Sequence, residues 1–263
     1  MLLQGKVAVI YGGGAIGGVV ALAFAREGAK VFVADHHASS LERIAQEIKV
    51  AGNLVETALV DALEKDAVEA FVDSVAKKAG CLDISFCATA THVPGGEQGA
   101  PFSELSYEDF SLPITDYTKS QFLTANAASK HMVKQGSGVI MMITAVPSQI
   151  PYPFTAGFGP AWAAVEAMSR TLAAELGPFG VRTICLHSAG SPEAAKSIEK
   201  TFTSSSQLAK RSEGWNQRSA SRNLLNKWPT LQDVGNMAAF YASDRAGVTT
   251  GTTVNLTGGM VND

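Results

Sequence analysis

The fold is decided by the stretch Lys6-Val-Ala-Val-Ile-Tyr-Gly-Gly-Gly-Ala-Ile-Gly-Gly18 and its continuation to Asp35. The apolar run Val7–Ile10 predicts a buried strand, and the glycine cluster behind it predicts a sharp turn. The Ala-rich pattern of Ile16–Arg26 then predicts a helix. A second predicted strand, Lys30–Ala34, places the acidic residue at its carboxyl end.

This strand–helix–strand layout is typical of a dinucleotide-binding site. Glycines let the backbone approach a pyrophosphate, and amide groups at a helix N-terminus meet its charge. The candidate phosphate-binding residues are Gly12, Gly14, Ile16 and Gly17. Asp35 is the candidate for the ribose hydroxyls. The alternative is a plain tight turn, because such turns also use clustered glycines.

Asp35 also favours NAD(H) over NADP(H). Its carboxylate would accept both ribose hydroxyls and repel a 2′-phosphate. The glycine run itself contains no Arg or Lys to offset this charge. His36 and His37 are the reservation, since a protonated imidazole could bind phosphate.

The composition is that of an ordinary globular protein. With 263 residues, 46% hydrophobic and 17% charged, the chain can bury a substantial core. A net charge of −3 gives no electrostatic reason to expect nucleic acid or an anionic membrane as partner. Neither a signal peptide nor a membrane span is expected, because no leader pattern and no apolar run of about 18 residues occurs. The three cysteines lack CxxC spacing, which argues against a disulfide framework and a metal site and favours a reducing cytoplasm.

Strand and helix patterns alternate along the rest of the chain. Further strands are expected at Leu54–Val60, Asp83–Cys87, Val139–Thr144, Val181–His187 and Thr253–Leu256, and helices at Ser39–Ala51 and Glu64–Ala79, the first capped by Ser39. These strands are short and apolar on both faces, which suits a parallel sheet covered by helices. The predicted fold is therefore α/β: a doubly wound parallel sheet of about seven strands in a single domain, residues 1–263.

Two segments interrupt this alternation. Residues 91–117 contain Pro94-Gly95-Gly96 and predict a loop with an irregular helix. Residues 191–228 are polar and rich in Ser and Lys. An insertion this long inside a compact domain is typical of a segment that covers a substrate. The alternative is a surface helical excursion without function.

Two more stretches, together with the opening unit, give the chain a resemblance to the short-chain dehydrogenase/reductase family. Ala163–Arg182 is similar to that family's long central helix and its turn into the sixth strand. Asp233–Arg245 and Thr250–Met260 are similar to its last helix, last strand and closing glycine pair. The resemblance covers nearly the whole chain and implies a Rossmann-type fold, a nicotinamide cofactor and a small-molecule substrate. It also implies pairing of the helices around Tyr117–Lys134 and Gly159–Gly177 between subunits, hence a homotetramer or homodimer.

The chain departs from the family's pattern in its cofactor loops. The glycine run is one residue shorter than usual, with Ala15 in place of a glycine. After the fourth strand the family's Asn-Asn-Ala-Gly becomes Cys87-Ala-Thr-Ala90, which keeps the small Ala88 beneath the cofactor. Asp61 stands where the family's aspartate contacts the adenine; alternatively it only caps the turn at Leu63.

The larger departure concerns catalysis. In this register the family's serine, tyrosine and lysine fall on Ala145, Phe158 and Trp162, and its asparagine falls near Tyr117. Phenylalanine has no transferable proton and tryptophan carries no charge, and losing a positioned proton donor costs about 10²–10⁴-fold in rate.

Other residues could supply the missing proton donor. Tyr152, between two prolines, and His187, at the end of the sixth strand, are the remaining candidates. The sequence shows no orienting partner for either, and a lone histidine is more often structural. Three functions stay open: an oxidoreductase with a non-standard site, a non-catalytic dinucleotide-binding protein, and non-redox chemistry in the same cleft.

Overall fold

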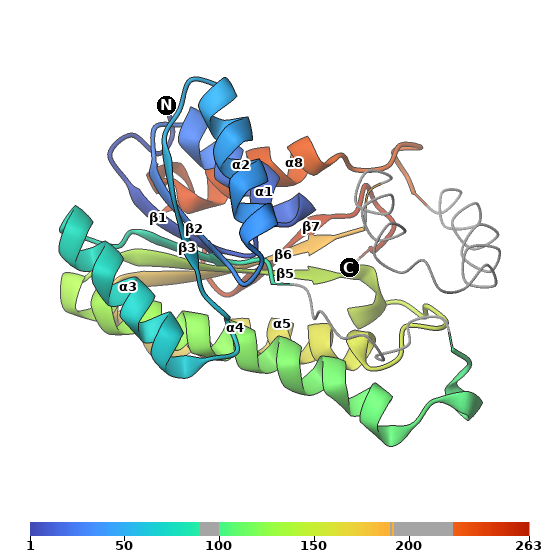
Figure 1. The fold of residues 1–263 in the computed structure, drawn as a ribbon. Helices are drawn as coiled ribbons and strands as arrows, with labels where there is room; N and C mark the ends of the chain where they lie inside the picture. Colours follow the sequence, from blue (N-terminus) through green and yellow to red (C-terminus); the bar gives the residue numbers. More distant parts are fainter. Residues whose placement is uncertain (90–99, 190, 192–222, 263) are drawn as a thin grey trace.

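Seven parallel strands form one sheet in the order β3-β2-β1-β4-β5-β6-β7 (Figure 1). The computed structural model describes residues 1–89, 100–189, 191 and 223–262. The strands are β1 (Val7–Tyr11), β2 (Lys30–Asp35), β3 (Val55–Leu59), β4 (Ile84–Cys87), β5 (Gly138–Ala145), β6 (Val181–Ser188) and β7 (Thr252–Leu256). The doubly wound parallel sheet predicted from the alternating pattern is confirmed.

Helices cover both faces of this sheet (Figure 1). One layer holds α1 (Ala15–Arg26), α2 (Ala38–Val50) and α8 (Leu231–Ala242). The other holds α3 (Lys65–Ala79), α4 (Tyr107–Gln135) and α5 (Phe158–Leu176). An apolar core lies between each helix layer and the sheet, because the side chains of a strand alternate between its two faces. In β1, for example, Ile10 faces the first layer and Val9 the second. None of the described helices is long and apolar enough to cross a membrane.

The direction of strand order reverses between β1 and β4. β1 pairs with β2 on one side and with β4 on the other, all in parallel. In doubly wound sheets, a crevice outside the carboxyl ends of the strands at such a reversal is where ligands bind. Gly12 and Ala88 stand at this point, each directly after its strand.

The structure corrects three local expectations. β3 is not apolar on both faces, because it is the edge strand and Glu56, Thr57 and Leu59 are exposed. Helix α2 begins at Ala38 with His37 as its N-cap and no side-chain cap, so Ser39 does not cap it. In residues 91–117, where a loop with an irregular helix was expected, the regular helix α4 already begins at Tyr107, and the Ser106 side chain caps it. Residues 90–99 and most of the expected insertion, 192–222, lie outside the described residues.

Candidate active site

The glycine turn after β1 approaches both its own helix and the residue after β4 more closely than a side chain would allow. Gly12 has a φ of +94°, and a Cβ there would lie 2.8 Å from the carbonyl oxygen of Ala88. A Cβ on Gly17 would lie 1.7 Å from the carbonyl oxygen of Gly12. At Gly14 a Cβ would meet none of the described residues within 4 Å. The two close approaches require glycine, whereas the described part of the chain leaves room for a side chain at Gly14.

The N-terminus of α1 opens toward this space. Gly14 is the N-cap and provides no side-chain cap, and the first turn holds no acidic residue. The amide groups of Ala15, Ile16 and Gly17 therefore lie at a helix end whose dipole favours an anion. This arrangement fits the pyrophosphate of a dinucleotide.

Asp35 is fixed beside the turn by two backbone amides. Its side chain is 9% exposed. Oδ2 accepts a hydrogen bond of 2.6 Å from Gly13 N, and Oδ1 accepts one of 2.7 Å from His37 N. A carboxylate has about four acceptor positions, so these two amides alone do not fill its hydrogen-bonding capacity.

Arg43 adds a cation at the turn that the sequence did not reveal. From helix α2 its Nη2 donates to the carbonyl oxygen of Gly13 at 2.5 Å. Its Nη1 donates to Glu47 Oε1 at 2.8 Å, so part of its charge is balanced within the helix. The residue was missed because it lies 30 positions from its partner, and no local pattern links the two.

The two remaining cofactor candidates have clear structural roles. Asp61 is exposed, and its Oδ1 accepts a hydrogen bond of 2.9 Å from Leu63 N, which is the capping alternative. Contact between Asp61 and an adenine stays a prediction. Ala88 continues β4, and its amide donates to the carbonyl oxygen of Tyr11 at 2.8 Å. The carbonyl oxygen of Ala88 lies so close to Gly12 that a Cβ there would be 2.8 Å from it.

Apolar and aromatic residues occupy the positions aligned with the family's catalytic set. Ala145 ends β5 and Phe158 begins α5, with Trp162 one turn later on the same helix. The Phe158 and Trp162 ring centroids are 5.4 Å apart. Trp162 also meets Tyr117 of α4 edge-to-face at 6.5 Å. These contacts form a continuous aromatic cluster.

Tyr117 cannot act as the missing acid in this arrangement. It is buried, and its hydroxyl donates to the carbonyl oxygen of Ile143. Burial raises the pKa of this phenol well above its ordinary value, with smaller contributions from Cys87 and Cys185. The hydroxyl therefore holds α4 to β5 rather than facing a substrate.

Below the carboxyl end of β5 lies a buried carboxylate that the sequence analysis did not single out. Glu166 projects from α5 and its side chain is 7% exposed. Its Oε1 accepts hydrogen bonds from His187 Nδ1 at 2.9 Å, Thr144 Oγ1 at 2.9 Å and Ser148 Oγ at 2.6 Å. Its Oε2 accepts one from Gln149 Nε2 at 3.1 Å. His187 therefore has the orienting carboxylate that the sequence did not show.

These contacts decide the charge of the cluster. Burial of Glu166 opposes ionisation, but the hydrogen bonds from His187, Ser148, Gln149 and Thr144 outweigh it and lower the pKa of the carboxyl to about 2. So acidic a group is a carboxylate at neutral pH and a very weak base. The Nε2 atom of His187 is buried and has no hydrogen-bond partner within the described residues.

A helical pattern could have found Glu166. It lies four residues after Trp162 and eight after Phe158, so all three share one face of α5. Its partners could not be found this way, because they lie 17 to 22 residues distant in sequence.

Tyr152 lies in the segment that leads from the 3-10 helix η2 (Val146–Ser148) to α5. It packs against an apolar cluster that includes Val146, Met260 and Val261. Further along, Phe154 and Ala156 adopt positive φ angles of 62° and 47°, which are strained for residues with a side chain. The segment is thus held in an unusual conformation beside the carboxyl edge of the sheet.

Sequence comparisons match nearly the whole chain to oxidoreductases. A family model described as enoyl-(acyl carrier protein) reductase matches residues 13–261. An uncharacterized oxidoreductase of Thermotoga maritima is 30% identical over 98% of each chain. The 2,5-dichloro-2,5-cyclohexadiene-1,4-diol dehydrogenase LinX of Sphingobium indicum is 30% identical over 98% of this chain and 96% of its own.

Solved structures agree with the fold described above. An NAD⁺-bound xylitol dehydrogenase superposes with a TM-score of 0.84 at 23% identity, covering 98% of this chain and all of the other. A 7α-hydroxysteroid dehydrogenase complexed with NADH and 7-oxo glycochenodeoxycholic acid has a TM-score of 0.81 at 25% identity, covering 98% and 94%. Both share the overall fold of this chain.

Proposed function

The chain belongs to the short-chain dehydrogenase/reductase family, and on that premise we propose that it is an NAD-dependent oxidoreductase with a non-standard active site. The observation that carries the proposal is the Asp35 carboxylate, fixed by the amides of Gly13 and His37 beside an open helix N-terminus. This pairing offers an acceptor for ribose and donors for pyrophosphate at one point of the crevice.

In this proposal the cofactor is held by the backbone around Gly12, Gly14, Ile16 and Gly17, by Asp35 at the ribose, by Asp61 near the adenine and by Ala88 beneath it. NAD is preferred to NADP because Asp35 would repel a 2′-phosphate. When bound, the nicotinamide supplies or accepts the hydride. The chain's own residues orient it and exclude water.

The reaction proposed is hydride transfer that needs little acid catalysis from the protein. Ala145, Phe158 and Trp162 can neither donate a proton nor stabilise a tyrosinate. A suitable substrate is an activated imine or a conjugated alkene, whose own electron demand assists the transfer. Tyr152 and His187 are the proposed proton-handling residues. His187 is favoured by its bond to Glu166, which fixes the orientation of the ring.

A second candidate function is dinucleotide binding without catalysis. It is supported by the aromatic cluster of Tyr117, Phe158 and Trp162. Two members of this cluster, Phe158 and Trp162, stand at aligned catalytic positions. A third, non-redox chemistry in the same cleft, is supported by the hydroxyl, carboxylate and imidazole groups gathered at Ser148, Glu166 and His187. Product analysis without cofactor consumption would reveal the third.

Further parts of the proposal concern assembly and setting. We infer a small-molecule substrate, a homotetramer or homodimer, and a cytoplasmic location. The segment 191–228 is proposed to cover the substrate, and 192–222 of it lie outside the described residues. No nucleic acid or membrane partner is proposed.

Cofactor binding is tested by thermal unfolding with NADH and with NADPH. At a concentration 100 times its dissociation constant, NADH should add about 2.7 kcal/mol to the free energy of unfolding. This should raise the melting temperature by roughly 5–10 °C. NADPH should act more weakly. Asp35→Ala should abolish most of the shift, whereas Asp66→Ala, at a fully exposed side chain on α3, should keep it. Absence of a shift with either dinucleotide would contradict the proposal.

Catalysis is tested separately from binding. A steady-state assay with NADH and a panel of imines, conjugated alkenes and ketones should give turnover above a cofactor-only blank for the first two classes. If NADH binds but none of the substrate classes is turned over, the second candidate function, dinucleotide binding without catalysis, is favoured.

A further inference from the structure

Three potential metal ligands lie together at the end of β2. The Nδ1 atom of His37 is 3.4 Å from Asp35 Oδ1, and the Nδ1 atom of His36 is 3.7 Å from the same oxygen. All three ligand atoms lie within 4.8 Å of one another. The two imidazole rings lie 3.8 Å apart, tilted by 48°. No other group of three such residues occurs within the described parts of the chain.

These separations suit a small transition-metal ion. With metal–nitrogen and metal–oxygen bonds of about 2.0–2.2 Å, neighbouring ligand atoms of a tetrahedral site lie about 3.3–3.6 Å apart. The two distances to Asp35 Oδ1 are close to this range. The histidine side chains are 43% and 45% exposed, so an ion in solution can reach them. Imidazole with carboxylate is a donor set that suits Zn²⁺, Ni²⁺ and Cu²⁺.

Backbone hydrogen bonds already fix the orientation of the Asp35 carboxylate. The amides of Gly13 and His37 hold its two oxygens in place, so little ordering is needed when a metal binds. The expectation of no metal site rested on the spacing of the cysteines and did not consider this juxtaposition. Two adjacent histidines after an acidic strand end are the sequence signal.

We propose that Asp35, His36 and His37 form a binding site for a divalent transition-metal ion, and that its occupancy excludes the adenosine ribose from Asp35. The exclusion rests on the proposed function, whereas the metal site does not. A ribose diol and a metal ion both need the outward lone pairs of one carboxylate. The ion would therefore act as a competitive inhibitor of dinucleotide binding.

Metal binding is tested by calorimetric titration of the chelator-treated protein with ZnCl₂ at about pH 7.5, where free imidazole is neutral and able to coordinate. The wild type should bind one ion. Loss of a mere supporting contact costs about 10- to 100-fold in metal affinity, so His36→Gln and His37→Gln should each cost at least that much. Circular dichroism confirms that the variants fold.

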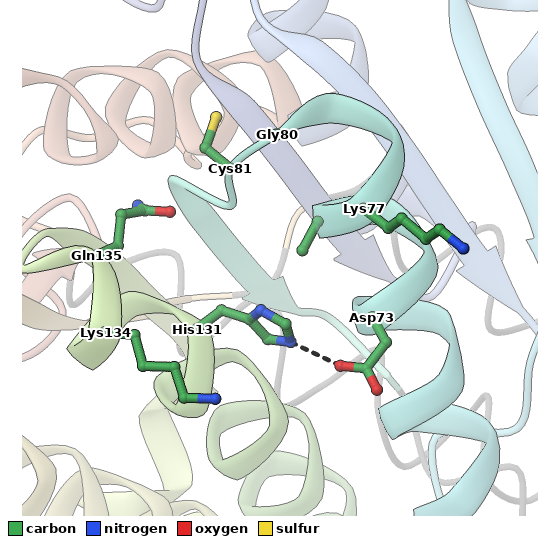
Figure 2. A pocket seen from close by; sticks show the side chains of 8 residues that line it. Asp73, Lys77, Gly80, Cys81, His131, Lys134 and Gln135 are labelled. Carbon is green, nitrogen blue, oxygen red and sulfur yellow. Dashed lines mark hydrogen bonds and ion pairs between the residues drawn. The ribbon is translucent and has the colours of Figure 1, made fainter.

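His131→Gln is the matched control. His131 on α4 also contacts an aspartate, with Nε2 2.7 Å from Asp73 Oδ1, in an open pocket between α3 and α4 that includes Cys81 (Figure 2). That pair has no third ligand atom within the described residues, so this variant should bind Zn²⁺ as the wild type does. The metal site is overturned if the wild type binds no ion, if His36→Gln and His37→Gln bind unchanged, or if His131→Gln abolishes binding.

Exclusion is tested by titrating NADH with and without Zn²⁺. At ten times its own dissociation constant, Zn²⁺ should raise the apparent dissociation constant of NADH about tenfold in the wild type and in His131→Gln. NADH binding that Zn²⁺ leaves unchanged overturns the exclusion. If Zn²⁺ binds and NADH does not, the proposed function fails while the metal site stands. If NADH binds and Zn²⁺ does not, the metal site and the exclusion both fail while the proposed function stands.

Discussion

Four donors converge on the Glu166 carboxylate from three neighbouring parts of the fold. Thr144 belongs to β5, Ser148 and Gln149 to the turn after it, and His187 to β6. A buried charge is tolerated only when hydrogen bonds replace its hydration. Here the replacement is complete enough to lower the pKa of the carboxyl despite its burial. The cluster therefore ties the turn after β5 to α5, beside the proposed substrate position.

Glu166→Gln should remove this stabilisation. The pKa of the carboxyl falls from an ordinary 4.5 to about 2 in the folded protein, and at about 1.4 kcal/mol per pKa unit its ionisation contributes about 3 kcal/mol at neutral pH. Because the folded pKa is the lower one, the contribution is complete above about pH 5 and is lost as the pH falls toward 2. Urea unfolding should show a deficit of about 3 kcal/mol at pH 7 that narrows with acidification.

Glu175→Gln provides the matched control for that measurement. It makes the same chemical change at an exposed position of the same helix, so it should alter the free energy of unfolding by less than about 0.5 kcal/mol. A Glu166→Gln deficit that stayed constant from pH 7 to pH 3 would show that shape, not charge, makes the contribution.

For single residues, the sequence predicts those whose role depends on their immediate neighbours in the chain. Asp35 and Gly12 could be placed because a strand end and a turn constrain their own backbone. Glu166 could not be interpreted, because its role depends on Thr144 and His187, which only the completed sheet brings into register opposite each other. Arg43 was missed for the same reason.

At the scale of elements, the contact between the β1 turn and helix α1 sets the entrance of the crevice. Gly17→Ala should destabilise the protein strongly, because the new Cβ would lie 1.7 Å from the carbonyl oxygen of Gly12 and the helix would have to move away. Overpacking of this kind costs about 1–3 kcal/mol or more. Gly14→Ala, with open space at its Cβ, should cost about 1 kcal/mol at most, as a poorer N-cap.

Thermal unfolding without ligand measures both glycine variants. Equal losses at the two positions would mean that the turn relaxes and that the close approach does not shape the site. The predicted order of losses also has a functional counterpart. Gly17→Ala should weaken NADH binding as well, because the displaced helix end would no longer present its amides at the same place.

The elements themselves were largely predictable, apart from those whose environment decides their character. Strands β1 and β2 and helix α1 lie within a residue or so of their expected bounds. Helix α4 begins at Tyr107, inside residues 91–117, for which a loop with an irregular helix was expected from Pro94-Gly95-Gly96. Pro113 lies inside this helix, where it removes one backbone hydrogen bond, and the Ser106 side chain caps the N-terminus by accepting from Asp109 N. The exposure of β3 follows from its edge position, which no pattern within the strand reveals.

For the whole molecule, strand order follows from alternation and right-handed crossovers, so the position of the crevice was predictable. The chemistry at the catalytic end was not, because it depends on contacts such as that between Glu166 and His187, which lie 21 residues apart in the sequence. The outer faces of α4 and α5 matter for a second property of the whole molecule, its oligomeric state. They cover the same face of the sheet and pack on each other, which leaves part of α4 directed to solvent (Figure 1).

Phe122→Glu should reduce the protein to a monomer. Phe122 lies on α4 with 52% of its surface exposed. It belongs to the helix around Tyr117–Lys134, which the family resemblance implies pairs between subunits. Light scattering after size exclusion should give two or four times 27.5 kDa for the wild type and 27.5 kDa for the variant. Val50→Glu, at a 77% exposed valine in the opposite helix layer, should keep the wild-type mass. A monomeric wild type would refute the proposed assembly, and an oligomeric Phe122→Glu would place the interface elsewhere on the molecule.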